Sequence, residues 1–361
     1  MALIVVVSHC SLVYDLPLGA RLTIDAVVNP HAAVIFFFVL SGYVLQGSLV
    51  RGKATVESAI GFYVRRIFRL VPLVAVVSAL ALTVTLALGE MPVLSGWLKA
   101  TLDPALVATP SQIALAFVGL SAVLLPPVWT IMVELLGSLY MPIHHWIQSS
   151  IRYGNALAVA LLLGLTVAIS LAYSDSLLRF LFYFALGAAL YAGRASWFPV
   201  LRSRPRLSRR VALASVLLLF GFRSLWFLGF DQRLVPVLVD YFNVWRGLLE
   251  GLFAALLIAS VVAMSGGVRW LRGRGATSTG DLSFGIYLFH FPVMSGVAWA
   301  LYRLFGTTGA SPLADATLLL GLTMLIVYPL SWAAYRWVER PGIEFARTIS
   351  RAPQMAEAPA V

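Results

Sequence analysis

The run AAVIFFFVLSGYVLQGSLV (32–50) carries no Asp, Glu, Lys or Arg and is typical of a single apolar helix. A helix needs about 20 mostly apolar residues to cross the roughly 30 Å hydrocarbon core of a bilayer, and this run is long enough. Runs of the same kind recur along the chain. We expect ten membrane-spanning helices, at 1–14, 32–50, 70–89, 128–148, 155–173, 177–193, 211–229, 245–265, 282–304 and 316–338.

The composition of the chain agrees with a membrane protein. Of 361 residues, 60% are hydrophobic and 11% are charged, and the mean hydropathy is +0.91. Soluble domains are about 45–50% apolar and about 25% charged, so the composition excludes a water-soluble enzyme and a disordered protein. The net charge of +11 comes from basic residues in short loops between the apolar runs, which reports membrane orientation and predicts no nucleic-acid partner. The single cysteine, Cys10, excludes an internal disulfide.

The distribution of basic residues predicts the topology. If Met1 is cytoplasmic and the ten spans alternate, 19 of the 26 Lys and Arg residues face the cytoplasm, as the positive-inside rule requires. The predicted fold is therefore all-α and polytopic, with both termini cytoplasmic. The apolar stretch 112–125 is short for a span and is interpreted as interfacial or re-entrant. We expect one integral membrane domain over 1–345 and a short, disordered cytoplasmic tail over 346–361.

The first predicted span is shorter than a bilayer requires. As a helix, residues 1–14 extend about 21 Å at about 1.5 Å per residue. A secretory signal peptide is rejected, because the segment has neither a charged start nor a small-residue cleavage site. We therefore expect the natural chain to begin some residues before Met1.

Ionisable side chains within the apolar runs are the candidates for function. The chain has no phosphate-binding glycine loop, no metal-ligand run and no nucleophile elbow, so we predict no metal. Intramembrane ionisable groups are costly and usually line a cavity or pair with one another. For any one of them, the alternative is a hydrogen-bonded structural residue or an interfacial carboxylate. The candidate residues are His9, Glu134, Glu250, His290 and Glu339.

Five phrases of the sequence together resemble the acyltransferase-3 family of integral membrane acyltransferases. They follow one another in the family's order and cover most of the chain: AVIFFFVLSGYVL (33–45), FYVRRIFRLVPL (62–73), VWTIMVELLGSLYMP (128–142), LSFGIYLFHFPV (282–293) and YRWVERP (335–341). The resemblance implies transfer of an acyl group, usually acetyl, from cytoplasmic acyl-CoA to a hydroxyl of a carbohydrate or similar acceptor. It also implies a multi-pass protein of the bacterial inner membrane.

The resemblance assigns the general base to His9. The family places an Arg eleven residues before a His on its first helix, and His9 matches the His. An imidazole is suited to removing the proton from a sugar hydroxyl as that oxygen attacks a thioester. The position of the family's Arg would precede Met1. Two explanations remain open: the start codon is assigned too late, or this copy lacks the Arg.

Three arginines before the third predicted span are candidates for binding acyl-CoA. Arg65 and Arg69 are four residues apart and Arg66 and Arg69 three apart, so their guanidinium groups share a helix face. Guanidinium groups form paired hydrogen bonds with phosphate oxygens. The alternative is anchoring to anionic lipid headgroups. The match to the family's Arg-x-x-Arg pattern favours the phosphates of CoA.

Two further phrases supply supporting residues. Glu134 lies in a partial match to the family's Trp-Ser-Leu-x-x-Glu element, with Thr130 in place of the serine, and either orients His9, binds the acceptor or lies wetted at the interface. His290 lies three residues after Tyr287, and a structural role with hydrogen bonds across helices is favoured for it. Glu339 and Arg340 are expected to form a local ion pair at the cytoplasmic surface.

Two other classes of function remain open. A transporter of a lipid-linked sugar or small metabolite would share this composition, although the two halves show no clear repeat. An inactive relative that serves as a scaffold is the third interpretation, because the family's Arg is missing from the chain as given. Consumption of acyl-CoA by membranes that contain the protein separates the enzyme from both.

Overall fold

The computed structural model describes residues 1–51, 55–89, 94–172, 176–221, 244–264, 273–306 and 311–356. All elements in these ranges are helical, which confirms the all-α prediction there. The helices are α1 (Ala2–Leu12), α2 (Leu18–Val27), α3 (Pro30–Val50), α4 (Val56–Leu88), α5 (Gly96–Leu106), α6 (Pro110–Phe117), η1 (Pro126–Val128), α7 (Trp129–Ser150), α8 (Gly154–Ala172), η2 (Leu177–Phe180), α9 (Leu181–Ala192), α10 (Arg194–Ser203), α11 (Pro205–Gly221), α13 (Val244–Ala263), α14 (Arg274–Phe305), α15 (Pro312–Ala334), η5 (Tyr335–Glu339) and α16 (Arg340–Ala356).

Six helical segments in the described ranges are long and apolar enough to cross a membrane, which makes the chain a multi-pass membrane protein. The bent pair Leu177–Ala192 and Arg194–Ser203 would add a seventh. The count of ten stays a prediction: α1 has only 11 residues, and residues 222–229 of one expected span lie outside the described residues. The six are Leu18–Val50, Val56–Leu88, Gly154–Ala172, Val244–Ala263, Arg274–Phe305 and Pro312–Ser350.

Two further regions can be compared with the expected topology. Within the apolar stretch 112–125, helix α6 ends at Phe117, so no continuous helix covers the stretch. Helix α16 continues through Ala356, so most of the segment expected to be a disordered tail is helical, and Ala346 is fully buried. Residues 357–361 of that tail lie outside the described residues.

The helices gather into two compact units. Unit 1 comprises Met1, Asp25–Ala59 and Val133–Thr277, and unit 2 comprises Ala2–Ile24, Ile60–Met132 and Ser278–Val361. Each unit combines segments that are distant in the sequence. The prediction of one domain over 1–345 therefore stays a prediction.

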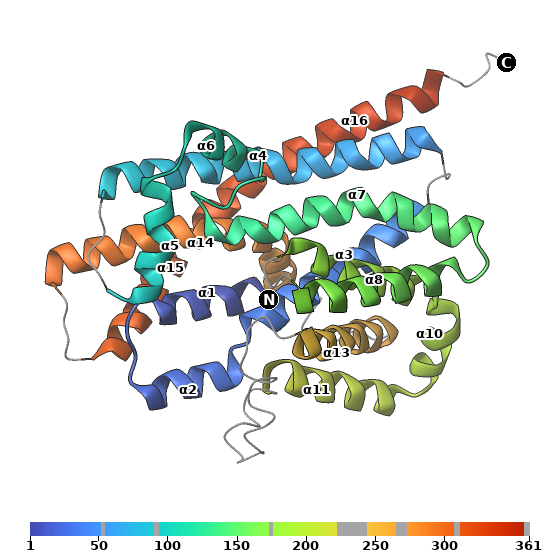
Figure 1. Ribbon diagram of the computed structural model, residues 1–361, viewed down its shortest axis with the longest axis horizontal. Coiled ribbons are helices and arrows are strands. Elements are labelled where there is room, and N and C mark those ends of the chain that lie inside the picture. The colour runs from blue at the N-terminus through green and yellow to red at the C-terminus, as the bar shows by residue number, and fades with distance from the viewer. Residues whose placement is uncertain are drawn as a thin grey trace. The chain divides into compact units, whose positions relative to one another are not determined.

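Unit 1 is built around the close approach of α3 and α9. A side chain at Gly42 would overlap the backbone of Phe184, and one at Gly187 would overlap the carbonyl oxygen of Val39. The rings of Phe38 and Phe184 stack with their centroids 5.4 Å apart beside this contact. Small residues allow backbones to approach in this way, and the resulting van der Waals packing holds helices together in lipid. Helix α13 packs against both α3 and α11 in the same unit (Figure 1).

Unit 2 places the amino-terminal helix beside the carboxy-terminal ones. Helix α1 packs against α15, and Ser95 at the start of α5 donates a hydrogen bond of 2.7 Å to the carbonyl of Leu12. Gly285 of α14 lies against Ser331 of α15. Helix α16 lies along α4, where Phe68 and Phe345 make an edge contact at 5.2 Å. These contacts bring α1, α4 and α14, which carry candidate site residues, into one unit.

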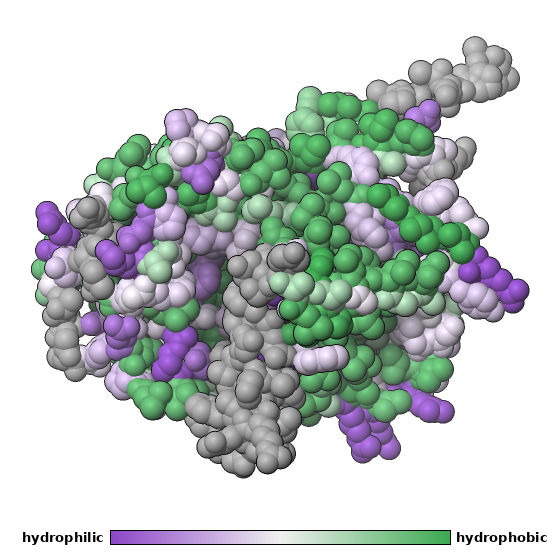
Figure 2. Space-filling view, in the orientation of Figure 1, coloured by the Kyte–Doolittle hydropathy of each residue, from purple (hydrophilic) through white to green (hydrophobic). Residues whose placement is uncertain are grey.

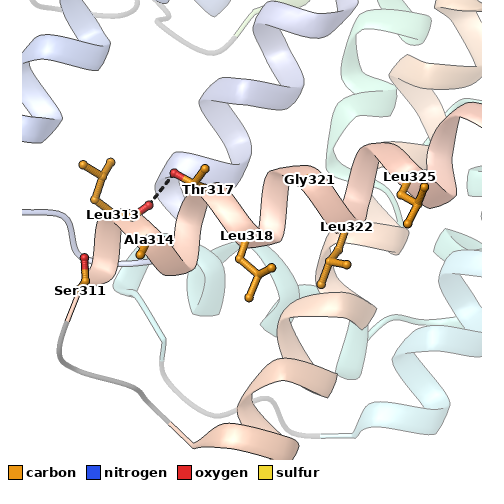
Figure 3. A pocket seen from close by; sticks show the side chains of 8 residues that line it. All are labelled: Ser311, Leu313, Ala314, Thr317, Leu318, Gly321, Leu322 and Leu325. Carbon is orange, nitrogen blue, oxygen red and sulfur yellow. Dashed lines mark hydrogen bonds between the residues drawn. The ribbon is translucent and has the colours of Figure 1, made fainter.

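Apolar surface covers the outward faces of several helices. On α8, the leucines at 157, 161, 163, 165 and 171 are all exposed, and Figure 2 shows a hydrophobic surface over this helix. Ser311, which precedes α15, and residues of α15 from Leu313 to Leu325 line a shallow apolar hollow (Figure 3). The hydroxyl of Thr317 in this hollow donates to the carbonyl of Leu313 at 2.8 Å, so its polar group is satisfied within its own helix. Both surfaces suit contact with lipid tails.

The close contact between α3 and α9 yields a stability prediction. Gly187→Ala should lower the free energy of unfolding by about 1–3 kcal/mol, because the added methyl forces the two backbones apart. The matched control is Gly164→Ala on α8, where nothing lies within 4 Å of the added carbon. Thermal unfolding in detergent measures both variants. Equal melting temperatures for the two variants would contradict the close packing.

Candidate functional site

His9 lies in the third turn of α1, half-buried within unit 2. Its Nδ1 is 2.9 Å from Nε2 of His290, a fully buried residue of α14. The ring of Trp97 from α5 lies against the His9 ring with a centroid separation of 5.3 Å, and Phe291 meets it edge-on at 6.4 Å. Helices α5 and α14 therefore fix the position of the imidazole that α1 carries.

The hydrogen-bond partners assign the protons on both rings. Nδ1 of His290 is 2.5 Å from the carbonyl oxygen of Tyr287, and because a carbonyl can only accept, this Nδ1 carries a proton. Nε2 of a neutral His290 then has none, so it accepts the hydrogen bond from the Nδ1–H of His9. In a neutral His9 the remaining nitrogen, Nε2, therefore carries a lone pair and no proton. That nitrogen is able to act as a base.

Tyr287, three residues before His290, forms hydrogen bonds with residues around the start of α7. Its hydroxyl donates to the carbonyl oxygen of Pro127 at 3.1 Å and accepts from the hydroxyl of Thr130 at 2.9 Å. Thr130 thus supplies a hydroxyl at the position where the Trp-Ser-Leu-x-x-Glu element of the family that the sequence resembles has a serine. The contacts join the phrases 128–142 and 282–293, which are distant in the sequence. The prediction that His290 makes a hydrogen bond across helices is confirmed, with His9 as its partner.

The three predicted phosphate-binding arginines lie together on α4. This helix runs unbroken through Arg65, Arg66 and Arg69, so the expected spacing on one face holds. Arg65 and Arg66 are half-buried, Arg69 is exposed, and the charges of Arg66 and Arg69 repel each other. An anion between these groups would relieve that repulsion.

Glu134 is buried in unit 1. Only 1% of its surface is exposed, so the interpretation as a carboxylate wetted at the interface is wrong. The hydroxyl of Ser41 donates to Glu134 Oε1 at 3.1 Å, which joins the phrases 33–45 and 128–142. Glu134 and His9 belong to different units, and the described hydrogen bond of the His9 ring is to His290. Orientation of His9 by Glu134 therefore stays a prediction.

Glu339 differs from expectation. The sequence predicts an ion pair between Glu339 and Arg340, but this is wrong, because Arg340 Nε pairs with Glu344 Oε1 at 2.9 Å. Glu339 is instead 5% exposed, at the end of the π-helical turn η5. Residues four apart on a helix face each other and adjacent residues do not, so the helix through Arg340 favours Glu344 over Glu339 as its partner.

A buried polar network in unit 1 surrounds Glu250. Its Oε2 lies 2.5 Å from Nδ1 of His31, and its Oε1 accepts from Arg246 Nε at 3.0 Å and from Asn29 Nδ2 at 2.7 Å. The Asn29 amide also donates to the carbonyl of Leu219 at 2.9 Å. Arg246 is fully buried. The network joins α3, α11 and α13 through groups whose charges compensate each other.

Sequence reasoning identified only Glu250 from this network. Arg246 and Glu250 are four residues apart within an apolar helix, and this spacing was the available signal of a buried pair. Asn29 and His31 lie in a different span, so their contribution depends on how α3 packs against α13. Trp97 and His9 are also distant in the sequence, so their ring contact likewise depends on how the helices pack.

The Glu250 network yields a second stability prediction. Glu250→Ala should destabilise the protein by about 3–5 kcal/mol, because it leaves the buried Arg246 without its carboxylate. The matched control is Glu344→Ala, which removes an exposed carboxylate that also pairs with an arginine four residues away. Thermal unfolding of both variants in detergent provides the test. A Glu250→Ala protein that melts with the Glu344→Ala protein would show that the network contributes little.

Comparison with known proteins assigns the chain to a family. The family model described as an acyltransferase domain matches residues 1–332, nearly the whole chain. No curated protein and no solved structure matches the chain. The match covers α1, α4, α7 and α14, which carry all the predicted catalytic and phosphate-binding residues.

Proposed function

The chain belongs to the acyltransferase-3 family and is a membrane acyltransferase, and on this premise we propose that it acylates hydroxyl groups. The proposed donor is cytoplasmic acyl-CoA, with acetyl as the acyl group. The proposed acceptor is a carbohydrate or a similar hydroxyl compound. The observation that carries the proposal is the half-buried His9, whose Nε2 is left unprotonated by the hydrogen bonds of His290.

In the proposed reaction, His9 acts as the general base. Its Nε2 takes the proton of the acceptor hydroxyl while the hydroxyl oxygen attacks the thioester carbonyl carbon. The new C–O bond forms, the C–S bond breaks, and the proton from the imidazolium goes to the departing CoA thiolate. His290 and Trp97 hold the ring in place, and His290 also stabilises the protonated form by accepting from Nδ1–H.

The arginines of α4 are the proposed site for the phosphates of CoA. Three guanidinium groups near one another supply the positive charge and the paired donors that phosphate oxygens require. Glu134 is the proposed supporting group: its buried carboxylate, already bonded to Ser41, is suited to accept a hydrogen bond from an acceptor hydroxyl. No metal takes part in this proposal.

The proposed topology places donor and acceptor on opposite faces of the membrane. Ten spans with both termini in the cytoplasm put Arg65, Arg66 and Arg69 at the inner face, where acyl-CoA is made, and the excess of loop arginines supports this orientation. The proposed location is the bacterial inner membrane.

The base assignment predicts the effect of removing His9. His9→Ala should lower the rate of acyl transfer about 10²- to 10⁴-fold, the usual contribution of a general base. The measurement is release of free CoA thiol from acetyl-CoA by purified protein supplied with a panel of carbohydrate acceptors. His145→Ala, which changes a histidine of unit 1, is the control and should retain activity. Wild-type rates in a folded His9→Ala protein would overturn the base assignment, and an absence of thiol release by the wild type would favour a transporter or scaffold.

The arginine cluster predicts a change in donor affinity. Arg69→Ala should raise the KM for acetyl-CoA roughly tenfold with a smaller effect on kcat, because one charge-assisted phosphate contact is worth about 1.5–3 kcal/mol. Arg152→Ala is the control, since Arg152 is an exposed arginine that lies over the ring of Tyr153. An unchanged KM in Arg69→Ala would favour the alternative that these arginines anchor lipid headgroups.

A further inference from the structure

Glu339 has a buried carboxylate oxygen that no described residue satisfies. The residue is 5% exposed, and its Oε1 has no hydrogen-bond partner among the residues that the structure describes. A buried polar atom without a partner forfeits the solvation it had in water, so native proteins rarely retain one without a role. Glu339 also ends the π-helical turn η5, and single π-turns within α-helices are frequent at functional sites.

The surroundings of Glu339 connect it with the arginines of α4. The carboxylate is attracted by the charge of Arg69 and repelled by that of Asp281. Within the described ranges, Arg69 acts on the carboxylate through its charge and forms no hydrogen bond to Oε1. Packing holds this arrangement in place: a side chain at Gly342, three residues after Glu339, would lie 2.7 Å from the carbonyl oxygen of Phe68. The start of α16 is therefore pressed against α4 beside Arg69.

The chemistry of the open position defines what it accepts. An acceptor oxygen next to phosphate-binding arginines repels the phosphates themselves and attracts an N–H or O–H group. Acyl-CoA carries such donors directly beside its phosphates: the ribose hydroxyl next to the 3′-phosphate, and the hydroxyl and amide N–H groups of the pantetheine arm next to the diphosphate. Inorganic pyrophosphate at neutral pH offers the charge without these neighbouring donor groups.

We propose that Glu339 Oε1 accepts a hydrogen bond from an N–H or O–H group of acyl-CoA when the α4 arginines hold the phosphates. Glu339 is then a specificity-determining residue of the donor site. The arginines supply attraction for any phosphate, and Glu339 selects the organic part of the molecule. This inference rests on the proposed function, because it takes Arg65, Arg66 and Arg69 as the phosphate site.

Equilibrium binding to the purified full-length chain in detergent tests the inference. The probes are acetyl-CoA, adenosine 3′,5′-bisphosphate, 4′-phosphopantetheine and inorganic pyrophosphate. The variants are Glu339→Leu, the nearly isosteric Glu339→Gln and the matched control Glu344→Gln on the exposed face of α16. We expect Glu339→Leu to weaken acetyl-CoA binding roughly 10- to 100-fold, the usual effect of losing a hydrogen bond to a charged group. We expect a smaller loss for Glu339→Gln and none for the control.

The pattern across the probes decides the outcome. Weaker binding of one organic fragment with unchanged pyrophosphate binding supports the inference and identifies which part of CoA supplies the donor. Equal weakening of all probes, pyrophosphate included, overturns it, because Glu339 would then act through the arginines. Wild-type acetyl-CoA affinity in a folded Glu339→Leu protein also overturns it. If Glu339→Leu does not fold, wild-type affinity in Glu339→Gln has the same meaning. Failure of the proposed function gives a different result: the wild-type protein itself does not bind acetyl-CoA.

Discussion

The hydrogen bond between His9 Nδ1 and His290 Nε2 determines what the candidate site is able to do. An isolated imidazole exchanges its proton between two nitrogens, and either one serves as the base. Here the carbonyl of Tyr287 fixes the proton of His290, and His290 fixes the proton of His9. The basic nitrogen is thereby the one pointing away from His290. A backbone carbonyl followed by a neutral histidine thus does for His9 what a carboxylate does for the histidine of a serine hydrolase: it sets the tautomer and the orientation.

Glu250 of unit 1 and Glu339 of unit 2 differ in how completely their buried carboxylates are hydrogen-bonded among the described residues. In unit 1, Glu250 accepts hydrogen bonds at both carboxylate oxygens, and the groups around it are themselves bonded to one another. Such a closed network stabilises helix packing and leaves no position for a ligand at the carboxylate. In unit 2, Glu339 keeps one oxygen unsatisfied beside a positive charge, which is the condition for binding a further group. This difference in pairing is why we assign different roles to Glu250 and Glu339, although both carboxylates are buried.

The sequence predicted those features that depend on neighbours along the chain. Apolar run length predicted long apolar helices such as α3 and α13, and the three- and four-residue spacings predicted that Arg65, Arg66 and Arg69 share a face of α4. The five phrases also identified the family. The ion pair of Glu339 with Arg340 failed because Glu344 competes for the same arginine one turn further on. Contacts between distant segments, such as His9 with Trp97 or His31 with Glu250, depend on helix packing, which one sequence does not encode in its local pattern.

The most direct test of the account is the protonation pattern of the His9 ring. Nitrogen-15 magnetic resonance of histidine-labelled protein in bilayers, with His9 assigned from the spectrum of a His9→Asn variant, reports which ring nitrogen carries the proton at a pH where both rings are neutral. We predict a proton on Nδ1 of His9, an unprotonated Nε2, and a close contact between His9 Nδ1 and His290 Nε2. A His9 ring with its proton on Nε2 would contradict this assignment, because the nitrogen that does not face His290 would then have no lone pair with which to act as a base.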